Sequence, residues 1–167
     1  IVCREIDTSK GILSSHLHSE GKHAEELSLI GPSTNRWVPE IIKANNPEDI
    51  SYYPYMNGQF VFKNAVIRFE QVILEGLKKN NLSPEDIDLL IPHQANLRIS
   101  EFVQRKFGLK DDQVYNNIEK YGNTTAASIP IALTEAWESG KIKSGDNIVL
   151  AAFGSGFTWG SVIINWQ

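Results

Sequence analysis

The sequence contains little cysteine, little excess charge and no long apolar run. Its single cysteine, Cys3, excludes an internal disulfide and favours a reducing compartment, which predicts a cytoplasmic protein. The formal net charge of −4 argues against general nucleic-acid binding, which requires a basic surface. No apolar run approaches the length needed to span a bilayer, and no signal peptide is visible. These absences predict a globular protein that binds neither nucleic acid nor membrane.

The length of 167 residues and the hydrophobic content of 41% are sufficient for one domain with a substantial core. The sequence contains no short-period repeat and no low-complexity tract, so a single domain over residues 1–167 is expected. The chain begins at Ile1, inside an apolar and strand-like run, rather than at a methionine. This beginning suggests a fragment of a longer protein.

Hydrophobic periodicity predicts strands that alternate with helices, and therefore an α/β fold with a mixed sheet. A helix is expected over Gln59–Lys79, because apolar residues recur there at helical spacing. Ser83–Asp86 combines an N-cap residue with a first-turn proline, which predicts a short helical turn. Further helices are expected over residues 95–107 and 126–139, and strands over residues 1–6, 11–18, 27–30, 87–91, 114–118, 147–152 and 161–166. Residues 31–57 show no sustained period and are expected to form a long ordered loop.

The last two expected strands, over residues 147–152 and 161–166, are rich in Ile, Val, Leu and Ala. This composition is typical of strands that are buried on both faces. Both are therefore expected near the centre of the sheet.

Three polar segments adjoin these expected elements. His93 follows the strand over residues 87–91, and side chains at the carboxyl ends of strands in open α/β sheets face the ligand crevice. Asn123 precedes a helix, and the glycine-rich segment Phe153–Gly160 follows a strand. A histidine, an asparagine and a glycine-rich turn could together polarise a carbonyl oxygen. Each also suits a structural role, as a core histidine, a turn residue and a tight turn, respectively.

The strings IPHQANLR, YGNTTAASIP and AAFGSGFTWG occur in this order along the chain. Together they resemble the C-terminal half of a 3-oxoacyl-[acyl-carrier-protein] synthase III, a condensing enzyme of the thiolase fold. The resemblance extends from about Gly11 to Trp166. It implies that the chain is the second of two similar halves in a layered α-β-α-β-α fold. This half would contain a five-stranded mixed sheet with helices packed on it.

The resemblance implies a catalytic role for His93 and Asn123. Both would donate hydrogen bonds to a thioester carbonyl oxygen while a carbanion forms beside it, and a neutral imidazole can do this with one N–H group. The backbone N–H of Ser155 would face the carbonyl of the acyl-enzyme. Relatives often have glycine at this position, so serine requires a backbone angle that a residue with a Cβ atom can adopt. Phe153 would shape the pocket beside the histidine.

Two further groups of residues follow from the resemblance. One group would line the pantetheine tunnel and consists of Met56, Gly58, Phe62, Asn96 and Phe153. The other would dock an acidic acyl carrier protein and consists of Lys63, Arg98, Arg105 and Lys106. The alternative interpretation of the tunnel group is a helix start with ordinary core residues. For the cations it is a solvated helix face, on which Glu101 could pair with either arginine.

Cys3 and the first histidines do not predict chemistry of their own. The nucleophile of the family is a cysteine at a helix N-terminus, whereas Cys3 lies in a strand-like run with no helix after it. The nucleophile is therefore expected in the absent N-terminal half. His16, His18 and His23 lie close together in sequence, but no cysteine or acidic residue stands at a matching spacing, so no metal site is expected.

The full-length protein is expected to be an acyltransferase that initiates fatty-acid synthesis. It would condense an acyl group from a coenzyme A thioester with malonyl-carrier protein, with loss of CO₂, to give a 3-oxoacyl carrier protein. No metal or redox cofactor is implied, and the full-length enzyme is expected to be a homodimer. The 167-residue chain alone is expected to be inactive. The alternatives are another thiolase-fold ketosynthase or acyltransferase of specialised metabolism, and a non-catalytic domain that binds an acyl carrier.

Overall fold

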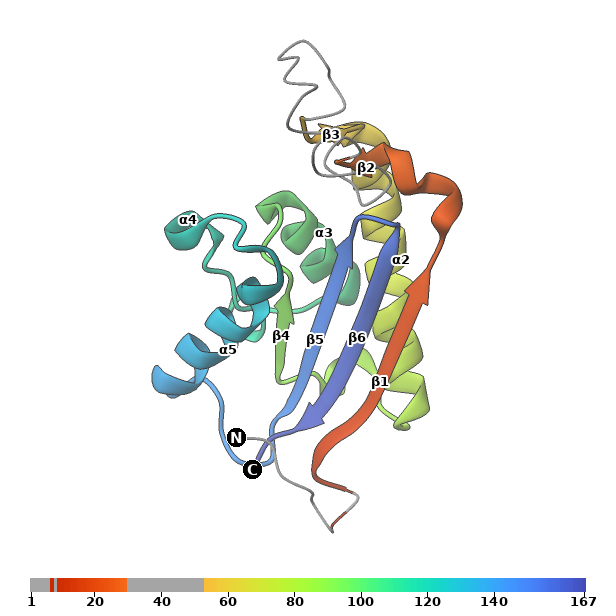
Figure 1. Ribbon diagram of the computed structural model, residues 1–167. Helices are drawn as coiled ribbons and strands as arrows, with labels where there is room; N and C mark the ends of the chain where they lie inside the picture. The colour runs from red at the N-terminus through yellow and green to blue at the C-terminus, as the bar shows by residue number, and fades with distance from the viewer. Residues whose placement is uncertain (1–6, 8, 30–52) are drawn as a thin grey trace, which may run out of the picture.

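The computed structural model describes residues 7, 9–29 and 53–167, and its centre is a mixed β-sheet (Figure 1). The sheet contains four strands in the order β1-β6-β5-β4. They are β1 (Gly11–Ser19), β4 (Leu89–Pro92), β5 (Asn147–Gly154) and β6 (Thr158–Asn165). Strands β4 and β5 are parallel, whereas β6 runs antiparallel to both of its neighbours. The predicted α/β class with a mixed sheet is therefore confirmed.

The described residues supply four of the five strands expected in this sheet. The strand expected over residues 1–6 lies outside the described residues. Two further short strands, β2 (Leu27–Ser28) and β3 (Tyr55–Met56), pair with each other instead of joining the main sheet. The strand expected over residues 27–30 is thus only two residues long within the described part. Most of the loop expected over residues 31–57 lies outside that part.

Helices cover both faces of the sheet. Helix α2 (Gly58–Lys79) packs on one face, and α3 (Leu97–Phe107) lies beside it (Figure 1). This face and α2 enclose the larger core cluster, which includes Phe69, Ile73, Val149 and Ile163. Helix α5 (Ser128–Glu138) packs on the opposite face, where Ala132 and Ala136 contact side chains of β4 and β5. The alternation of side chains along β4 and β5 therefore serves two separate cores.

Helix α2 forms where the apolar periodicity predicts it. Val66, Phe69, Ile73 and Leu77 are buried, as expected for one face of a helix. The side chain of Asn57 caps the helix by accepting a hydrogen bond from the backbone N–H of Phe60. The expected start at Gln59 is therefore one residue late.

The other predicted helices are also present, with shifted boundaries. Helix α3 begins at Leu97 after the N-cap Asn96, and it ends at Phe107 before the C-cap Gly108, whose φ of 66° suits glycine. The helix expected over residues 126–139 is a short helical turn (Thr125–Ala127) followed by α5. The turn at Pro84–Asp86 has the capping box in which Ser83 and Asp86 satisfy each other's backbone groups.

The strand expected over residues 114–118 is wrong. Val114 makes only an isolated bridge to Leu90, and helix α4 (Ile118–Tyr121) begins where the strand was expected to end. The N–H of Tyr115 donates to the carbonyl of Leu90 over 2.9 Å, and beyond this bridge side chains hold the segment. Gln94 accepts a hydrogen bond from the backbone N–H of Asn117, and the hydroxyl of Ser100 donates one to the side-chain oxygen of Asn116. The apolar pattern of this segment therefore reflects one buried anchor, Val114, rather than a strand.

Burial on both faces, expected for the last two strands, is found mainly in β5. Ile148 and Val149 are adjacent and face opposite cores, and both are fully buried. In β6, Ile163 is buried against α2, whereas Val162 and Ile164 on the other face are only partly buried. Within the described residues, no helix is both long enough and apolar enough to cross a bilayer.

Candidate functional site

His93 follows β4 directly, at the carboxyl end of the strand. Its backbone N–H continues the parallel pairing by donating to the carbonyl of Ala151 over 2.8 Å. Its side chain is partly buried, and Nδ1 lies 2.6 Å from Oγ of Ser128. Burial lowers the pKa of His93 from its ordinary value of 6.5 because it penalises the charged imidazolium. The site therefore favours a neutral imidazole, which can donate one hydrogen bond and accept another.

Gln94 fixes the turn that carries His93. Its side chain is buried, and its amide donates to the carbonyl of Pro92 over 2.7 Å and to that of Tyr115 over 3.3 Å. Its oxygen accepts the backbone N–H of Asn117 over 3.0 Å. The end of β4 is thereby tied to the segment that leads towards Asn123.

Asn123 lies in the exposed turn between α4 and α5. Its side-chain oxygen accepts the backbone N–H of Thr125 over 2.9 Å. Thr125 has a φ of 53°, an uncommon angle for a residue with a Cβ atom, and this hydrogen bond supports it. With its oxygen engaged in the turn, Asn123 has its amide N–H groups left to donate. The turn residue and the hydrogen-bond donor are thus two functions of one side chain.

Glu135 on α5 anchors the helix that precedes Asn123. Its carboxylate accepts hydrogen bonds from Asn117 over 2.8 Å and from Lys120 and Tyr121 over 2.5 Å each. These donors, with the hydrogen bond from Asn117 first, lower the pKa of Glu135 to about 2. Helix α4 is therefore tied to α5 by an ionised carboxylate.

The glycine-rich segment forms the turn between β5 and β6. Phe153 is buried, and its ring packs on Phe157 with 4.9 Å between centroids. Ser155 is exposed, and its carbonyl accepts the hydroxyl of Thr158 over 2.9 Å. The residues with positive φ include Gly156 but not Ser155, so a serine is accommodated there without backbone strain.

The three polar segments lie towards the same end of the sheet. Strands β4 and β5 are parallel, with Pro92 opposite Ala151, so His93 and the turn after β5 lie at the same end. Ser128 connects the histidine to the start of α5, which follows the Asn123 turn by a few residues. This end of the sheet thus combines a neutral imidazole, an amide donor and an exposed turn, which are groups suited to holding a developing oxyanion.

The residues proposed for pantetheine binding lie in several environments. Met56 is 60% exposed on β3, and Gly58 is exposed in the first turn of α2. Phe62 is partly buried and packs edge-to-face on Phe102 of α3, with 6.5 Å between centroids. Asn96 is exposed and uses its oxygen as the N-cap of α3, accepting the N–H of Arg98.

The four candidate docking cations lie on α2 and α3, which pack side by side. Lys63, Arg98 and Arg105 are exposed. Lys106 bridges the two helices by pairing with Glu70 of α2 over 3.3 Å. Within the described residues Glu101 makes no ion pair with Arg98 or Arg105, so the alternative of local pairing is not observed.

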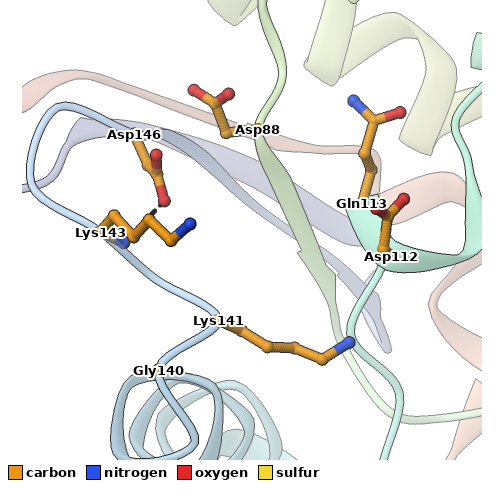
Figure 2. A pocket seen from close by; sticks show the side chains of 7 residues that line it. All are labelled: Asp88, Asp112, Gln113, Gly140, Lys141, Lys143 and Asp146. Atoms are coloured by element: carbon orange, nitrogen blue, oxygen red, sulfur yellow. Dashed lines mark hydrogen bonds between the residues drawn. The ribbon is translucent and has the colours of Figure 1, made fainter.

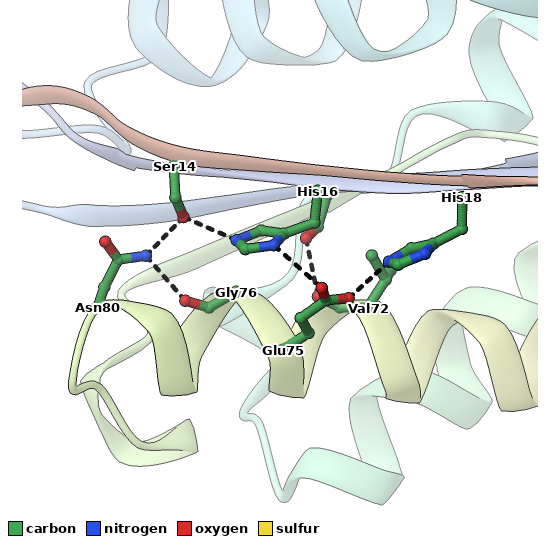
Figure 3. A network of polar contacts seen from close by, with 8 residues as sticks. Ser14, His16, His18, Val72, Glu75, Gly76 and Asn80 are labelled. Carbon is green, nitrogen blue, oxygen red and sulfur yellow. Dashed lines mark hydrogen bonds and ion pairs between the residues drawn. The ribbon is translucent and has the colours of Figure 1, made fainter.

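The histidines of β1 take part in a structural network rather than a metal site (Figure 3). His16 and His18 contact the two carboxylate oxygens of Glu75 on α2, at 3.3 Å and 2.6 Å. His16 also contacts Ser14, which accepts the amide of Asn80 over 2.6 Å. In the described part of the chain, no cluster of three or more His, Cys, Asp and Glu residues is arranged to hold a metal ion. Cys3 lies outside the described residues.

A shallow pocket of about 350 Å³ lies at the opposite end of β4 from His93 (Figure 2). It is lined by charged and polar residues of the α5–β5 connection and of the segments next to β4, including Asp88, Asp112, Lys141 and Asp146. Asp88 precedes β4 and Asp146 precedes β5, so the pocket is at the amino ends of these strands. It does not belong to the site around His93.

Sequence patterns alone did not single out Ser128, Gln94 or Glu135. All three are polar side chains that are buried or partly buried, and each makes hydrogen bonds to residues far away in sequence. Ser128 does lie within the string YGNTTAASIP, but the string gives no sign that this serine contacts the histidine.

Comparison with known proteins places these segments in one family. Residues 77–166 match the family described as 3-Oxoacyl-[acyl-carrier-protein (ACP)] synthase III C terminal. The chain is 44% identical over 158 residues to the beta-ketoacyl-[acyl-carrier-protein] synthase III of Rhodospirillum centenum, covering 94% of this chain and 45% of that protein. The corresponding synthase of Clostridioides difficile is 45% identical over 157 residues, covering 93% of this chain and 46% of that protein.

A solved structure gives the same result. The 3-oxoacyl-[acyl-carrier-protein] synthase III of Aquifex aeolicus aligns with a TM-score of 0.82 and 39% identity, over 98% of this chain and 46% of that one. The chain thus spans about half the length of the curated relatives that it matches. The three motifs, the mixed sheet and the family match agree, and the chain belongs to the 3-oxoacyl-[acyl-carrier-protein] synthase III C-terminal family.

Proposed function

We propose that this chain is the enolate-stabilising part of an enzyme that condenses an acyl-coenzyme A with malonyl-carrier protein. The product is a 3-oxoacyl carrier protein, the first intermediate of fatty-acid chain growth. The observation that supports this function best is the position of His93 at the same end of the sheet as the Ser155 turn, in contact with Ser128 of the helix that follows the Asn123 turn.

In the proposed condensation, the bond between the malonyl Cα and its carboxylate breaks, and CO₂ leaves. The electron pair of that bond moves into an enolate, whose thioester oxygen becomes negatively charged. The Nε2–H group of His93 and the amide of Asn123 donate hydrogen bonds to this oxygen, and fixed donors of this kind lower the barrier where charge develops. This step needs no base, because decarboxylation itself generates the carbanion.

The carbanion then attacks the carbonyl carbon of an acyl-enzyme thioester. A new carbon–carbon bond forms, and the enzyme's thiolate leaves. The backbone N–H of Ser155 would donate to the acyl carbonyl oxygen during this attack, and its exposed position in the turn supports that role. The nucleophile is proposed to be a cysteine contributed by a segment outside this chain, so the chain alone should be inactive. No metal or redox cofactor takes part in the proposed reaction.

Substrate and partner binding are proposed on the same basis. Met56, Gly58, Phe62, Asn96 and Phe153 would contact the pantetheine arm shared by coenzyme A and the carrier protein. The cations Lys63, Arg98, Arg105 and Lys106 would attract the acidic carrier. The complete enzyme is proposed to be a homodimer.

The test uses the complete synthase, which includes the segment with the nucleophilic cysteine. It measures the first half-reaction, acylation of that cysteine, separately from the second, which begins with malonyl decarboxylation. His93→Ala and Asn123→Ala should each reduce malonyl decarboxylation by on the order of 100-fold, the effect of losing one oxyanion donor. Acylation of the cysteine should change much less. His18→Ala removes an exposed imidazole that contacts Glu75, and it serves as the matched control.

Rates of the two half-reactions distinguish the proposed function from the alternatives. Equal losses in acylation and decarboxylation would contradict the assignment of His93 and Asn123 to the second half-reaction. Acyl transfer by the 167-residue chain alone would contradict the proposal that the nucleophile lies elsewhere.

A further inference from the structure

Ser128 is a buried residue that contacts one proposed oxyanion donor, His93, and lies near the other, Asn123, in sequence. It is the first residue of α5, it is 2% exposed, and it follows Asn123 by five positions. Its hydroxyl oxygen lies 2.6 Å from Nδ1 of His93 and accepts the backbone N–H of Gln94 over 3.3 Å. The serine thus contacts the catalytic candidate and also the residue that fixes its turn.

The number of donors around this hydroxyl determines the direction of the hydrogen bond to His93. The backbone N–H of Gln94 can only donate, so Ser128 Oγ is an acceptor in that contact. Its own hydrogen then needs an acceptor. Among the described residues, the side-chain hydroxyl of Ser128 has no hydrogen-bonding partners other than His93 and Gln94. The hydrogen therefore points to Nδ1 of His93.

A protonated Nδ1 would give a poorer arrangement. The serine oxygen would accept two hydrogen bonds, and its own hydrogen would be buried without an acceptor, which proteins rarely tolerate. With an unprotonated Nδ1, all three groups are satisfied. A neutral imidazole whose Nδ1 accepts carries its proton on Nε2.

We propose that Ser128 is a positioning residue that holds His93 as the Nε2–H tautomer and aims that N–H at the oxyanion. The proposal rests on the proposed function, because the value of this tautomer lies in donating to the enolate oxygen. Since Ser128 begins the helix that follows the Asn123 turn, the same hydrogen bond also couples the positions of the two donors.

The first test reads the tautomer directly and needs no activity. Long-range ¹H–¹⁵N spectra of the histidine rings at pH 7.5 should show Nε2 protonated and Nδ1 unprotonated at His93. Ser128→Ala should yield a mixture of tautomers or the Nδ1–H form, whereas Ser128→Thr keeps the hydroxyl and should restore the Nε2–H form. Ser161→Ala is the matched control, because Ser161 is equally buried but donates to the carbonyl of Val72.

The second test uses the half-reactions of the complete synthase. Ser128→Ala should lower kcat for malonyl decarboxylation by at least about 10-fold with little change in KM, because loss of the group that fixes a catalytic tautomer can cost up to about 10⁴-fold. Ser128→Thr should recover most of the rate, and Ser161→Ala should not reduce it. A general loss of folding would instead affect acylation as well.

The outcomes distinguish this proposal from the proposed function. An Nδ1–H tautomer in the unaltered protein, or an unchanged Nε2–H tautomer in Ser128→Ala, would overturn the role of Ser128. That measurement on the unaltered protein stands even if the alanine variant does not fold. If His93→Ala left decarboxylation unchanged while the tautomer depended on Ser128, the proposed function would fail and the hydrogen-bond assignment would survive.

Discussion

The charge of His93 depends on its surroundings more than on its neighbours in sequence. Burial lowers its pKa, and the hydroxyl of Ser128 faces Nδ1. Protonation would place a hydrogen on Nδ1, where Ser128 already donates. Both effects keep the imidazole neutral near pH 7, the state in which it can act as a single donor.

The lowered pKa of His93 predicts a pH dependence of stability. Below about pH 6.5 the unfolded chain takes up a proton at this histidine, whereas the folded chain does not until a lower pH. The free energy of unfolding should therefore decrease as pH falls below about 6.5, and this contribution should level off below the folded pKa. Urea unfolding of the original chain and of His93→Gln from pH 8 to pH 5 measures it. An identical pH slope in both proteins would contradict the prediction.

At this scale, the sequence indicated His93 and Asn123 as candidate site residues but not the side chains that hold them. His93 and Asn123 follow from strand-end and turn patterns together with family strings, because such signals are local. Ser128 and Glu135 act through hydrogen bonds over 35 and up to 18 positions, respectively. Hydrophobic periodicity cannot predict a contact between residues so far apart in sequence, because the contact depends on how α5 packs against β4.

At the scale of elements, α4 is a single helical turn whose position depends on one carboxylate. Four residues cannot form a stable helix by themselves. Asn117, Lys120 and Tyr121 all donate to Glu135, so the turn that carries Asn123 is held from α5.

Glu135→Gln should loosen α4 and reduce stability in a pH-dependent manner. The pKa of Glu135 is lowered to about 2, so its contribution is present above about pH 4.5 and is lost as pH falls from 4.5 towards 2. The difference in the unfolding midpoint between the original chain and the variant should therefore be largest near neutral pH and shrink in acid. Glu138→Gln, on the same helix, is the control, because Glu138 makes no ion pair within the described residues. Equal effects of the two changes would argue against the anchor.

Gly160 determines how closely β6 approaches β1. A Cβ atom at this position would lie 2.7 Å from a methyl group of Leu17 and 2.8 Å from the backbone oxygen of His16. Gly160→Ala should therefore destabilise the protein by about 1–3 kcal/mol in urea unfolding, as expected for overpacking. Gly154→Ala is the matched control on β5, where the nearest atom would be 4.0 Å away. If the control were equally destabilised, the contact with β1 would not be the cause.

Elements were predictable where one strong local signal dominates. The 22-residue α2 has a continuous apolar stripe, and the ends of α3 carry cap residues. The segment 114–118 was predicted wrongly because a short apolar run cannot reveal whether a neighbouring strand edge is available to it. Here the side chains of Gln94 and Ser100 hydrogen-bond to the backbone N–H of Asn117 and to the side chain of Asn116 instead.

At the scale of the whole molecule, the net charge does not reveal how the exposed cations are distributed. The chain is acidic overall, yet Lys63, Arg98 and Arg105 are exposed on two helices that pack side by side. The single ion pair that the described residues place in this group joins Lys106 to Glu70. Three cations are therefore available to an acidic partner.

Charge reversal at Arg98 tests whether these cations dock a carrier protein. An exposed ion pair contributes up to about 1 kcal/mol, so Arg98→Glu in the complete synthase should raise KM for malonyl-carrier protein by up to about fivefold. Activity with malonyl-pantetheine, which lacks the carrier, should change little. Lys143→Glu makes the same charge change at the opposite end of the sheet and should leave KM unaltered.

Salt provides the decisive comparison for the docking surface. Exposed charges are screened beyond about 8–10 Å at physiological ionic strength, so added salt should weaken the reaction with the carrier and spare the reaction with malonyl-pantetheine. The Arg98→Glu variant should show a smaller salt dependence, since it has already lost part of the attraction. A defect in the chemical step would instead reduce activity with both substrates. Equal losses with both substrates, or no response to salt, would show that these cations serve the fold and not the partner.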